Sequence, residues 1–202
     1  MGVIKQGEDC VFSPVKGKYI HLKDVSDATF NSGVLGTGFA VDPKEDVIHA
    51  PVEGIISAVF PTGHAVGFTT DNGLEVLVHI GIDTVGLNGT GFEILKQQGE
   101  RVRAHEPVIR FDRELIRRQG LDPMVMVVFT NGGEYNLKLM PGEQVTEETQ
   151  LAAANAGGEN VNEEKRTSGY EYGKMCSEIL EAVGGSHNIK NVFHCITRLR
   201  IV

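Results

Sequence analysis

The sequence of 202 residues predicts a mostly β protein: an antiparallel β sandwich or barrel-sandwich, followed by a linker and an incomplete α+β segment. Glycine contributes 25 residues, well above the usual share of roughly 7%, which favours strands and tight turns over a helical bundle. Short apolar runs, separated by turn signals, recur about every 10 residues up to residue 150. The predicted strands are 18–22, 38–41, 54–60, 66–70, 74–80, 107–111 and 124–129.

Two local sequence signals predict connections between these strands. Asn72-Gly73 lies between two of the predicted strands and is typical of a hairpin turn. A short helix is expected over Arg113–Gln119, because Asp112 is a good N-terminal cap and Gly120 a good residue to follow the last turn.

The domain organisation has three parts: a domain over 1–151, a flexible linker over 152–168 and the beginning of a second domain over 169–202. The linker is predicted because 152–168 holds almost no large apolar side chains to offset the entropy lost on ordering. Alternatively, the alanines at 152–154 continue a short helix. In the last part, a helical spacing of apolar residues over 172–183 precedes one strand over 192–202. One helix and one strand are too few to fold alone, so this part is either truncated or docked on the first.

Composition excludes several classes of function. The formal net charge of −8 argues against nucleic acid as the main partner. The three cysteines are odd in number and lack CxxC spacing, which argues against a disulfide framework or a cysteine zinc site. Neither a signal peptide nor an apolar run long enough to span a bilayer is visible. We therefore expect a cytoplasmic location.

Two histidines stand out by their context. His64 begins one strand of the predicted hairpin and His79 lies near the end of the other, so that antiparallel pairing brings them opposite each other. Such a pair can bind a metal or share a phosphoryl group, or its members can be unrelated residues at strand ends. Thr62 can fix the tautomer of His64 or cap the turn. Asp27 and Asp83 lie in loops, where ordinary surface charge is the alternative to a functional role.

Cys195 is the one cysteine with a distinctive neighbourhood. Arg198 and Arg200 follow it on alternate positions of the predicted strand, and guanidinium groups lower the pKa of a nearby thiol. The alternative is that Cys195 is a small buried apolar residue.

Three motifs together resemble the glucose-family enzyme IIA of the bacterial sugar phosphotransferase system: Ala50–Gly54 (APVEG), Val78–Val85 (VHIGIDTV) and Gly99–Val102 (GERV). The resemblance runs from about Val11 to about Leu151. It implies a β sandwich with a shallow two-histidine site. The family's last apolar strand is replaced here by Leu151 and three alanines, which puts that edge of the fold in question.

The resemblance also implies roles for individual residues. His79 would accept the phosphoryl group from the phosphocarrier protein HPr, with His64 contacting that group and Thr62 bonded to His64. Asp27 and Asp83 match acidic positions that receive an arginine of the carrier. No metal and no organic cofactor is implied. The apolar docking surface would consist of Phe30, Leu35, Phe60 and Val85.

The end of the chain carries a second resemblance, to the start of an enzyme IIB domain of the glucose and β-glucoside kind. It rests on Gly184-Gly185, Asn188-Ile189 and the run HCITRLR over 194–200. It implies that Cys195 is a phosphoryl acceptor and that Arg198 and Arg200 contact the phosphate. Because only the beginning of such a domain is recognisable, we expect Cys195 to be inactive in these 202 residues.

The sequence thus predicts a phosphoryl carrier that works with HPr, with the IIB domain of a sugar permease and, through IIB, with the membrane IIC domain. Three alternatives stay open. One is a non-catalytic regulator that binds transporters or kinases. A second is a zinc peptidase-like β domain, although His79-Ile80-Gly81 lacks the second histidine that such a site needs. The third is a zinc ion that bridges His64 and His79 to a carboxylate of a partner.

Overall fold

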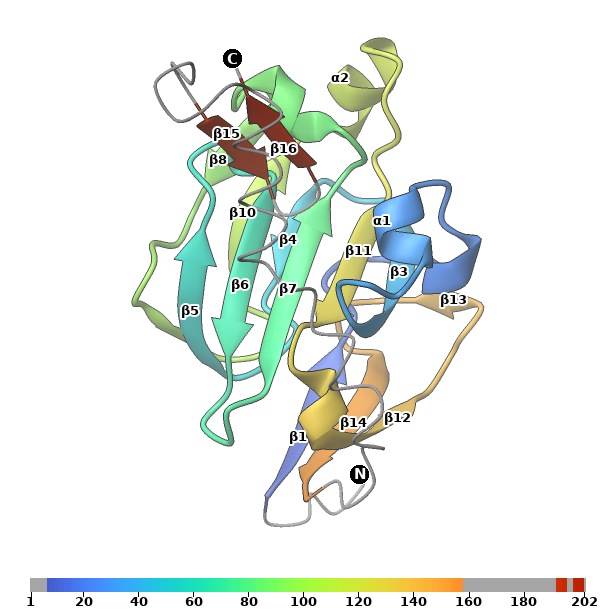
Figure 1. Ribbon diagram of the computed structural model, residues 1–202, viewed down its shortest axis with the longest axis vertical. Helices are drawn as coiled ribbons and strands as arrows, with labels where there is room; N and C mark the ends of the chain where they lie inside the picture. The colour runs from blue at the N-terminus through green and yellow to red at the C-terminus, as the bar shows by residue number, and fades with distance from the viewer. Residues whose placement is uncertain (1–6, 158–191, 196–197, 202) are drawn as a thin grey trace, which may run out of the picture. The chain divides into compact units, whose positions relative to one another are not determined.

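The computed structural model describes residues 7–157, together with the backbone of 192–195 and 198–201 (Figure 1). The chain divides into two compact units, Met1–Gly158 and Glu159–Val202. The strand pairs among the described residues are all antiparallel, which confirms the mostly β antiparallel class. The seven strands predicted within the first 150 residues are all present, with ends shifted by no more than one or two residues.

An eight-stranded sheet forms the centre of the first unit, with β11 and β7 in its middle (Figure 1). Its strands in spatial order are β13 (Gln144–Val145), β2 (Gly17–His21), β3 (Thr37–Pro43), β11 (Val125–Phe129), β7 (Glu75–Ile80), β6 (Ala65–Thr69), β5 (Gly54–Val59) and β9 (Arg101–Val102).

Two three-stranded sheets complete the first unit. One has β10 in its centre, with the order β4 (Val47–His49), β10 (Pro107–Phe111) and β8 (Phe92–Ile94). The other has β14 in its centre, with the order β1 (Glu8–Phe12), β14 (Gln150–Ala156) and β12 (Tyr135–Leu139). Strands far apart in the sequence therefore close the sandwich, because β14 joins the beginning of the domain to its end.

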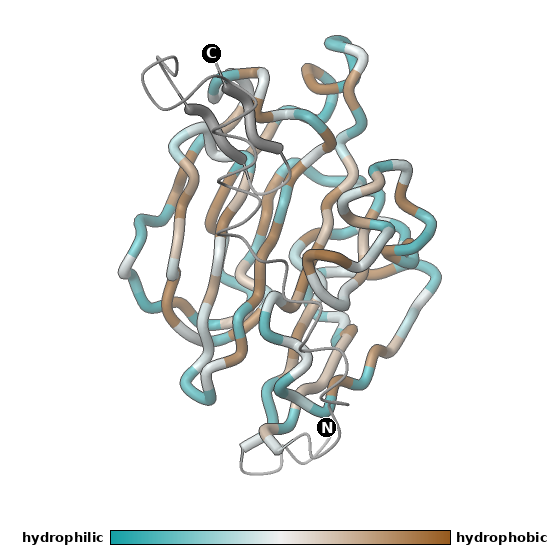
Figure 2. The backbone as a smooth tube through the Cα atoms, in the orientation of Figure 1, coloured by the Kyte–Doolittle hydropathy of each residue, from teal (hydrophilic) through white to brown (hydrophobic). Residues whose placement is uncertain are grey.

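The core lies against one face of the large sheet, as the alternation within β7 shows. Val76, Val78 and Ile80 belong to the buried apolar core, whereas Leu77 and His79 project from the opposite face because successive side chains alternate along a strand. Figure 2 shows hydrophobic colour along the central strands and hydrophilic colour in most of the connecting loops. The core thus anchors β7 and leaves its other face to carry the histidine.

Short helices occupy the connections. The α-helices are α1 (Ala28–Asn31) and α2 (Arg113–Arg118), and the 3₁₀ turns are η1 (Leu22–Asp24), η2 (Thr84–Leu87) and η3 (Gly132–Glu134). The helix predicted over Arg113–Gln119 is confirmed as α2, together with its caps. The Asp112 carboxylate accepts the Leu115 N–H at 2.8 Å, and Gly120 follows with a φ of 75°.

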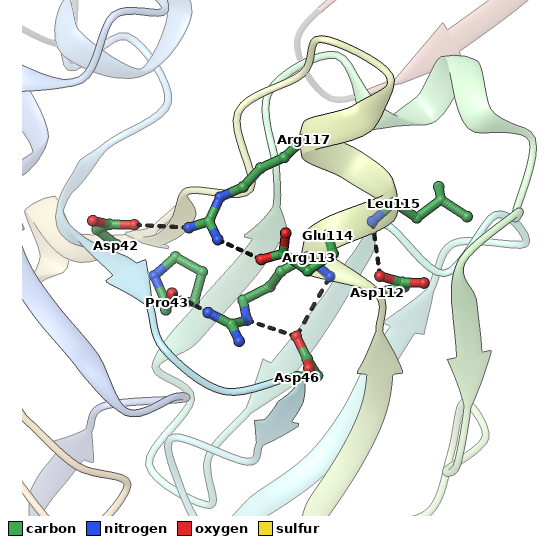
Figure 3. Close-up of polar contacts among 8 residues, drawn as sticks. All are labelled: Asp42, Pro43, Asp46, Asp112, Arg113, Glu114, Leu115 and Arg117. Atoms are coloured by element: carbon green, nitrogen blue, oxygen red, sulfur yellow. Dashed lines mark hydrogen bonds and ion pairs between the residues drawn. The ribbon is translucent and has the colours of Figure 1, made fainter.

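Arginine side chains fasten α2 to the turn between β3 and β4 (Figure 3). Arg113 donates to the Asp46 carboxylate at 2.6 Å and to the Pro43 carbonyl at 3.0 Å. Arg117 lies 3.9 Å from the Asp42 carboxylate. Arg113 is mostly covered while its partner is half exposed, so this ion pair fixes orientation more than it adds stability.

The predicted linker is wrong at its beginning. Residues 150–156 form β14, which pairs with β1 and with β12, and Ala152, Ala153 and Ala154 are buried there. The alternative of a helix over these alanines is equally wrong. Small side chains suit a strand that is covered on both edges, and pairing with distant strands overrides the weak β propensity of alanine. Residues 158–168 of the predicted linker lie outside the described residues.

The predicted single strand at the end of the chain is also wrong. The backbone forms a hairpin of β15 (Val192–Cys195) and β16 (Arg198–Ile201), in which Cys195 pairs with Arg198 and Phe193 with Arg200. The helix expected over 172–183 lies outside the described residues. Within the described part of the chain, no helix is both long enough and apolar enough to cross a membrane.

Candidate functional site

The hairpin of β6 and β7 brings His64 and His79 together. The register pairs His79 with Ala65, and the Ile80 N–H donates to the His64 carbonyl at 2.7 Å. The centroids of the two imidazole rings lie 5.1 Å apart, and the ring planes meet at 78°. The opposition of the two histidines, which was predicted from the Asn72-Gly73 turn between them, is confirmed.

The sheet positions His79 from both sides. β7 lies between β6 and β11, so Ala65 and Met126 are the cross-strand neighbours of His79. Both neighbours are buried. Directly opposite residues of an antiparallel pair share a face, which places His79 on a well-supported surface of the central strands.

The two histidines are buried, and most of their polar atoms have no partner. Their exposed fractions are 1% for His64 and 2% for His79. Nδ1 of His64 is hydrogen-bonded to the Thr62 hydroxyl at 2.5 Å. Nε2 of His64 and both ring nitrogens of His79 have no hydrogen-bond partner among the described residues. Buried polar atoms are normally paired, so the three vacant nitrogens mark a site that is built to meet another group.

Burial keeps both imidazoles neutral. Desolvation lowers the pKa of His64 to about 4. Desolvation, and after it the proximity of His64, lowers the pKa of His79 to about 3, although the Gly81 backbone and the Asp27 carboxylate act in the opposite direction. Each ring therefore keeps a lone pair on one nitrogen at neutral pH, which a nucleophile or a metal ligand requires.

Aromatic rings border the two histidines. Phe60 lies edge-on to His64 at a centroid distance of 5.4 Å, and Phe30 lies edge-on to His79 at 5.1 Å. Phe30 is buried and Phe60 is half-buried. The structure thus places both of these predicted docking residues directly against the site.

The two predicted acidic residues occupy different local structures. Asp27 is buried and caps α1, its carboxylate accepting the Thr29 N–H at 2.8 Å. Asp83 is half-buried and precedes η2 in a left-handed conformation with a φ of 59°. Asp27 lies close enough to His79 to act on its pKa. Asp27 therefore lies at the start of α1, and Asp83 lies in the turn that follows β7.

The other predicted docking residues, Leu35 and Val85, are half-buried. Val85 lies in η2, a few residues after His79, and Leu35 lies in the loop between α1 and β3. Sequence reasoning missed Val34, which is 71% exposed beside Leu35. The signal available in the sequence was an apolar pair, Val34-Leu35, flanked by Gly33 and Gly36. A large exposed apolar side chain is a feature of interaction surfaces.

A metal site is incomplete in the described part of the chain. No group of three or more His, Cys, Asp or Glu side chains there is arranged to hold a metal ion. His64 and His79 together supply two imidazoles, so a third ligand would have to come from elsewhere.

Cys195, Arg198 and Arg200 belong to the hairpin of the second unit. The register makes Cys195 the cross-strand partner of Arg198. Opposed residues of an antiparallel pair lie on one face, and alternate residues of a strand share a face, so Cys195, Arg198 and Arg200 occupy positions on the same face of this hairpin. The sequence had placed the two arginines on one face of one strand, and the hairpin brings Cys195 to that face.

This antiparallel β domain carries two neutral histidines side by side, bordered by apolar side chains. These are the features of a IIA-type phosphoryl-transfer component. Comparison with protein families gives the same class. Residues 9–135 match the family described as phosphoenolpyruvate-dependent sugar phosphotransferase system, EIIA 1, and the chain belongs to that family. Residues 177–202 match the phosphotransferase system EIIB family. The protein is therefore a phosphotransferase-system EIIA component followed by a partial EIIB domain.

Individual relatives agree with this assignment. The chain is 40% identical over 124 residues to a glucose-specific EIIA component of Staphylococcus epidermidis, covering 61% of this chain and 75% of the relative. It is 40% identical over 128 residues to a β-glucoside-specific EIIBCA component of Bacillus subtilis, covering 63% of this chain and 21% of that longer protein. The solved structure of glucose permease IIA from Mycoplasma capricolum is similar with a TM-score of 0.70 and 35% identity, covering 76% of this chain and 99% of that one.

Proposed function

We propose that His79 is the residue that accepts the phosphoryl group from phospho-HPr. The observation that carries this proposal is the state of the ring: it is neutral and buried, and neither nitrogen has a hydrogen-bond partner among the described residues. In the transfer, a lone pair of His79 forms a new N–P bond while the bond between phosphorus and the carrier breaks. Transfer of this kind depends mainly on positioning and on electrostatic stabilisation. The central strand β7 provides the positioning of His79.

His64 is the group that contacts the transferred phosphoryl oxygens. Its ring lies 5.1 Å from that of His79, and its Nε2 atom is unpartnered. With the Thr62 hydroxyl donating to Nδ1, the proton of neutral His64 resides on Nε2. That N–H is a donor aimed at the negative charge of a phosphoryl group beside His79. Thr62 therefore orients His64 and selects its tautomer.

Docking of the carrier uses an apolar surface made up of Val34, Leu35, Phe60 and Val85, with the buried Phe30 ring packed against His79. This surface excludes water from the phosphohistidine and so slows its hydrolysis. Asp27 and Asp83 supply negative charge for an arginine of HPr. Charges at the edge of such an interface mainly accelerate encounter.

The phosphoryl group then passes to a cysteine of a IIB domain and from there to a sugar that crosses the membrane with a IIC domain. The protein works on the cytoplasmic side and reaches the membrane through the permease. The name of one relative, a β-glucoside-specific EIIBCA component, supports these partners, because it joins B, C and A parts in one protein. Neither a metal nor an organic cofactor takes part in these steps.

Reconstitution tests the proposal. The chain is incubated with phosphoenolpyruvate, enzyme I and HPr, and the labelled site is located by mass spectrometry as an acid-labile, base-stable phosphate. The wild type becomes labelled at His79, and His79→Ala is not labelled on this domain. His105→Gly is the matched control, because His105 has a φ of 72° that glycine adopts readily. Equal labelling of His79→Ala and His105→Gly would refute the assignment.

A further inference from the structure

Three asparagines of the chain are each followed by glycine: Asn72-Gly73, Asn88-Gly89 and Asn131-Gly132. Asparagine is a chemically labile residue, and most so before glycine, because the backbone nitrogen of the next residue attacks its side-chain carbonyl carbon and displaces the amide. Glycine favours this attack, since it has no Cβ atom in the way and adopts many backbone conformations. The proposed transfer uses none of these six residues, so the surroundings of each dipeptide decide its reactivity.

Hydrogen bonds hold the peptide unit of Asn72-Gly73 at both ends. The Asn72 carbonyl accepts the Tyr135 hydroxyl at 2.8 Å, and the Gly73 N–H donates to the Thr70 carbonyl at 3.0 Å. The Asn72 side chain also donates to the Asp9 carboxylate at 3.1 Å. The peptide unit must rotate to bring the glycine nitrogen onto the side-chain carbon, so these bonds oppose the attack.

At Asn131-Gly132 the side chain itself is held. The Asn131 amide nitrogen donates to the Gly73 carbonyl at 2.9 Å, and the amide oxygen accepts the Glu75 N–H at 2.9 Å. The Asn131 carbonyl accepts the Glu134 N–H at 3.0 Å, and Gly132 is buried. The side chain therefore cannot turn toward the Gly132 nitrogen without losing hydrogen bonds on both of its polar atoms.

The peptide unit of Asn88-Gly89 has no such restraint. Within the described range 7–157, neither the Asn88 carbonyl nor the Gly89 N–H makes a hydrogen bond. Asn88 is exposed, and its amide nitrogen makes one long contact, with the Gly86 carbonyl at 3.4 Å. This peptide unit can therefore rotate without losing a hydrogen bond of its own, and the glycine nitrogen is open to attack the side chain.

We propose that Asn88 is a modification site, at which the chain loses a side-chain amide spontaneously and earlier than at Asn72 or Asn131. The Gly89 nitrogen forms a bond to the Asn88 Cγ atom while the bond between Cγ and Nδ2 breaks, and the proton of the Gly89 N–H leaves with Nδ2 as ammonia. Water then opens the succinimide ring. Opening at one ring carbonyl gives aspartate, and opening at the other gives isoaspartate, in which the backbone runs through the former side-chain carbonyl.

The position of Asn88 gives this modification a consequence for the histidine site. Gly89 lies against the turn that carries Thr62, because a Cβ atom added at Gly89 would be 3.8 Å from the Thr62 Cα atom. Thr62 in turn is bonded to Nδ1 of His64. Isoaspartate lengthens the backbone by a carbon atom beside this contact. We therefore expect it to displace Thr62 and to slow onward transfer, an effect that rests on the proposed function of His64.

Incubation of the full chain in mildly alkaline buffer tests the assignment, with peptide mapping by mass spectrometry to locate each conversion of amide to acid. In heavy-oxygen water the product should take up solvent oxygen, as opening of the succinimide requires. We expect Asn88 to react about tenfold faster than Asn72 and Asn131, since two or more hydrogen bonds restrain each of those residues. In urea, where the folded contacts are lost, the three asparagines should react at similar rates.

Two variants test the cause and the consequence. Tyr135→Phe frees the Asn72 carbonyl, so loss of the Asn72 amide should accelerate about fivefold while the rate at Asn88 stays the same. Asn88→Gly has no amide to lose and accepts the left-handed φ of 50° at this position, which makes it the matched control. After incubation, transfer to a IIB domain should be slower in the wild type, in proportion to its isoaspartate content, and unchanged in Asn88→Gly.

A folded chain in which Asn72 or Asn131 reacts as fast as Asn88 would overturn the proposal, as would a folded chain that keeps all three amides while the chain in urea loses them. An unchanged rate of transfer in a chain rich in isoaspartate would overturn the link to Thr62. Failure of the proposed function is recognised separately. In that case His79→Ala still accepts phosphate, while the peptide mapping, which needs no transfer, keeps its meaning.

Discussion

The imidazole rings of His64 and His79 lie 5.1 Å apart and nearly perpendicular, in a buried position where neither ring carries a charge at neutral pH. Protonation of either ring would place a cation in an apolar site, and protonation of both would add repulsion between them. This arrangement therefore couples the stability of the protein to the pH in a definite direction.

The first prediction concerns acid stability. The unfolded histidines titrate near pH 6.5, whereas the folded pKa is about 3 for His79 and about 4 for His64. Between these values the unfolded chain binds protons that the folded chain excludes. The free energy of unfolding therefore has its full value above about pH 6.5 and decreases as the pH falls. We expect His79 alone to account for a loss on the order of 2 kcal/mol by about pH 5, measured by urea unfolding.

His79→Asn is the control for this prediction, because it removes the titrating ring. The variant should lose less free energy of unfolding than the wild type over the same pH range. Equal losses in the two proteins would show that this ring does not control the acid sensitivity.

The second prediction separates acceptance of the phosphoryl group from its onward transfer. His64→Ala retains the nucleophile at His79 and loses the donor on Nε2, so it should become phosphorylated and then pass the group to a IIB domain roughly 100-fold more slowly. Single-turnover transfer from the purified phosphoprotein measures this step. His64→Gln, which restores an N–H donor, should recover part of the rate. A wild-type rate in His64→Ala would remove His64 from the mechanism.

The third prediction concerns the two acids. Asp83→Asn and Asp27→Asn remove charge and preserve local structure, because asparagine tolerates the left-handed φ at position 83 and can cap α1 at position 27. We expect each variant to bind HPr with an association rate several-fold lower at low ionic strength, with the difference vanishing at high salt. Stopped-flow titrations at two ionic strengths measure it. A salt dependence equal to that of the wild type would argue against electrostatic steering by these residues.

Local patterns were sufficient to predict much of this site. Alternating apolar residues and the Asn72-Gly73 turn defined the hairpin, and the hairpin placed His64 opposite His79. The pairing of Thr62 with His64 followed from a separation of two residues and is confirmed as a contact. These features depend on neighbours in the sequence, so periodicity and turn chemistry reveal them.

Features that depend on distant partners were not predictable in this way. The role of Asp27 as a helix cap was not predicted, because a helix as short as α1 leaves no periodic pattern in the sequence. Thr84 closes the turn after β7 by donating its hydroxyl to the Ile80 carbonyl, a contact that no spacing rule encodes. The alanines of β14 looked like a linker because their burial comes from β1 and β12, whose pairing is invisible to local hydropathy.

The last prediction tests β14 directly. Ala152 is fully buried between Val11 of β1 and Leu139 of β12, whereas Ala156 is exposed at the end of the same strand. Ala152→Asp places an unpaired carboxylate in the core and should lower the free energy of unfolding by about 3 kcal/mol or more. Ala156→Asp introduces the same side chain into solvent and should change it by no more than about 0.5 kcal/mol. Urea unfolding of the full chain measures both values, and hydrogen exchange should show protected amides along β14 because it is bonded on both sides. Since a flexible linker would tolerate both substitutions equally, similar stabilities of the two variants would contradict the presence of this strand in solution.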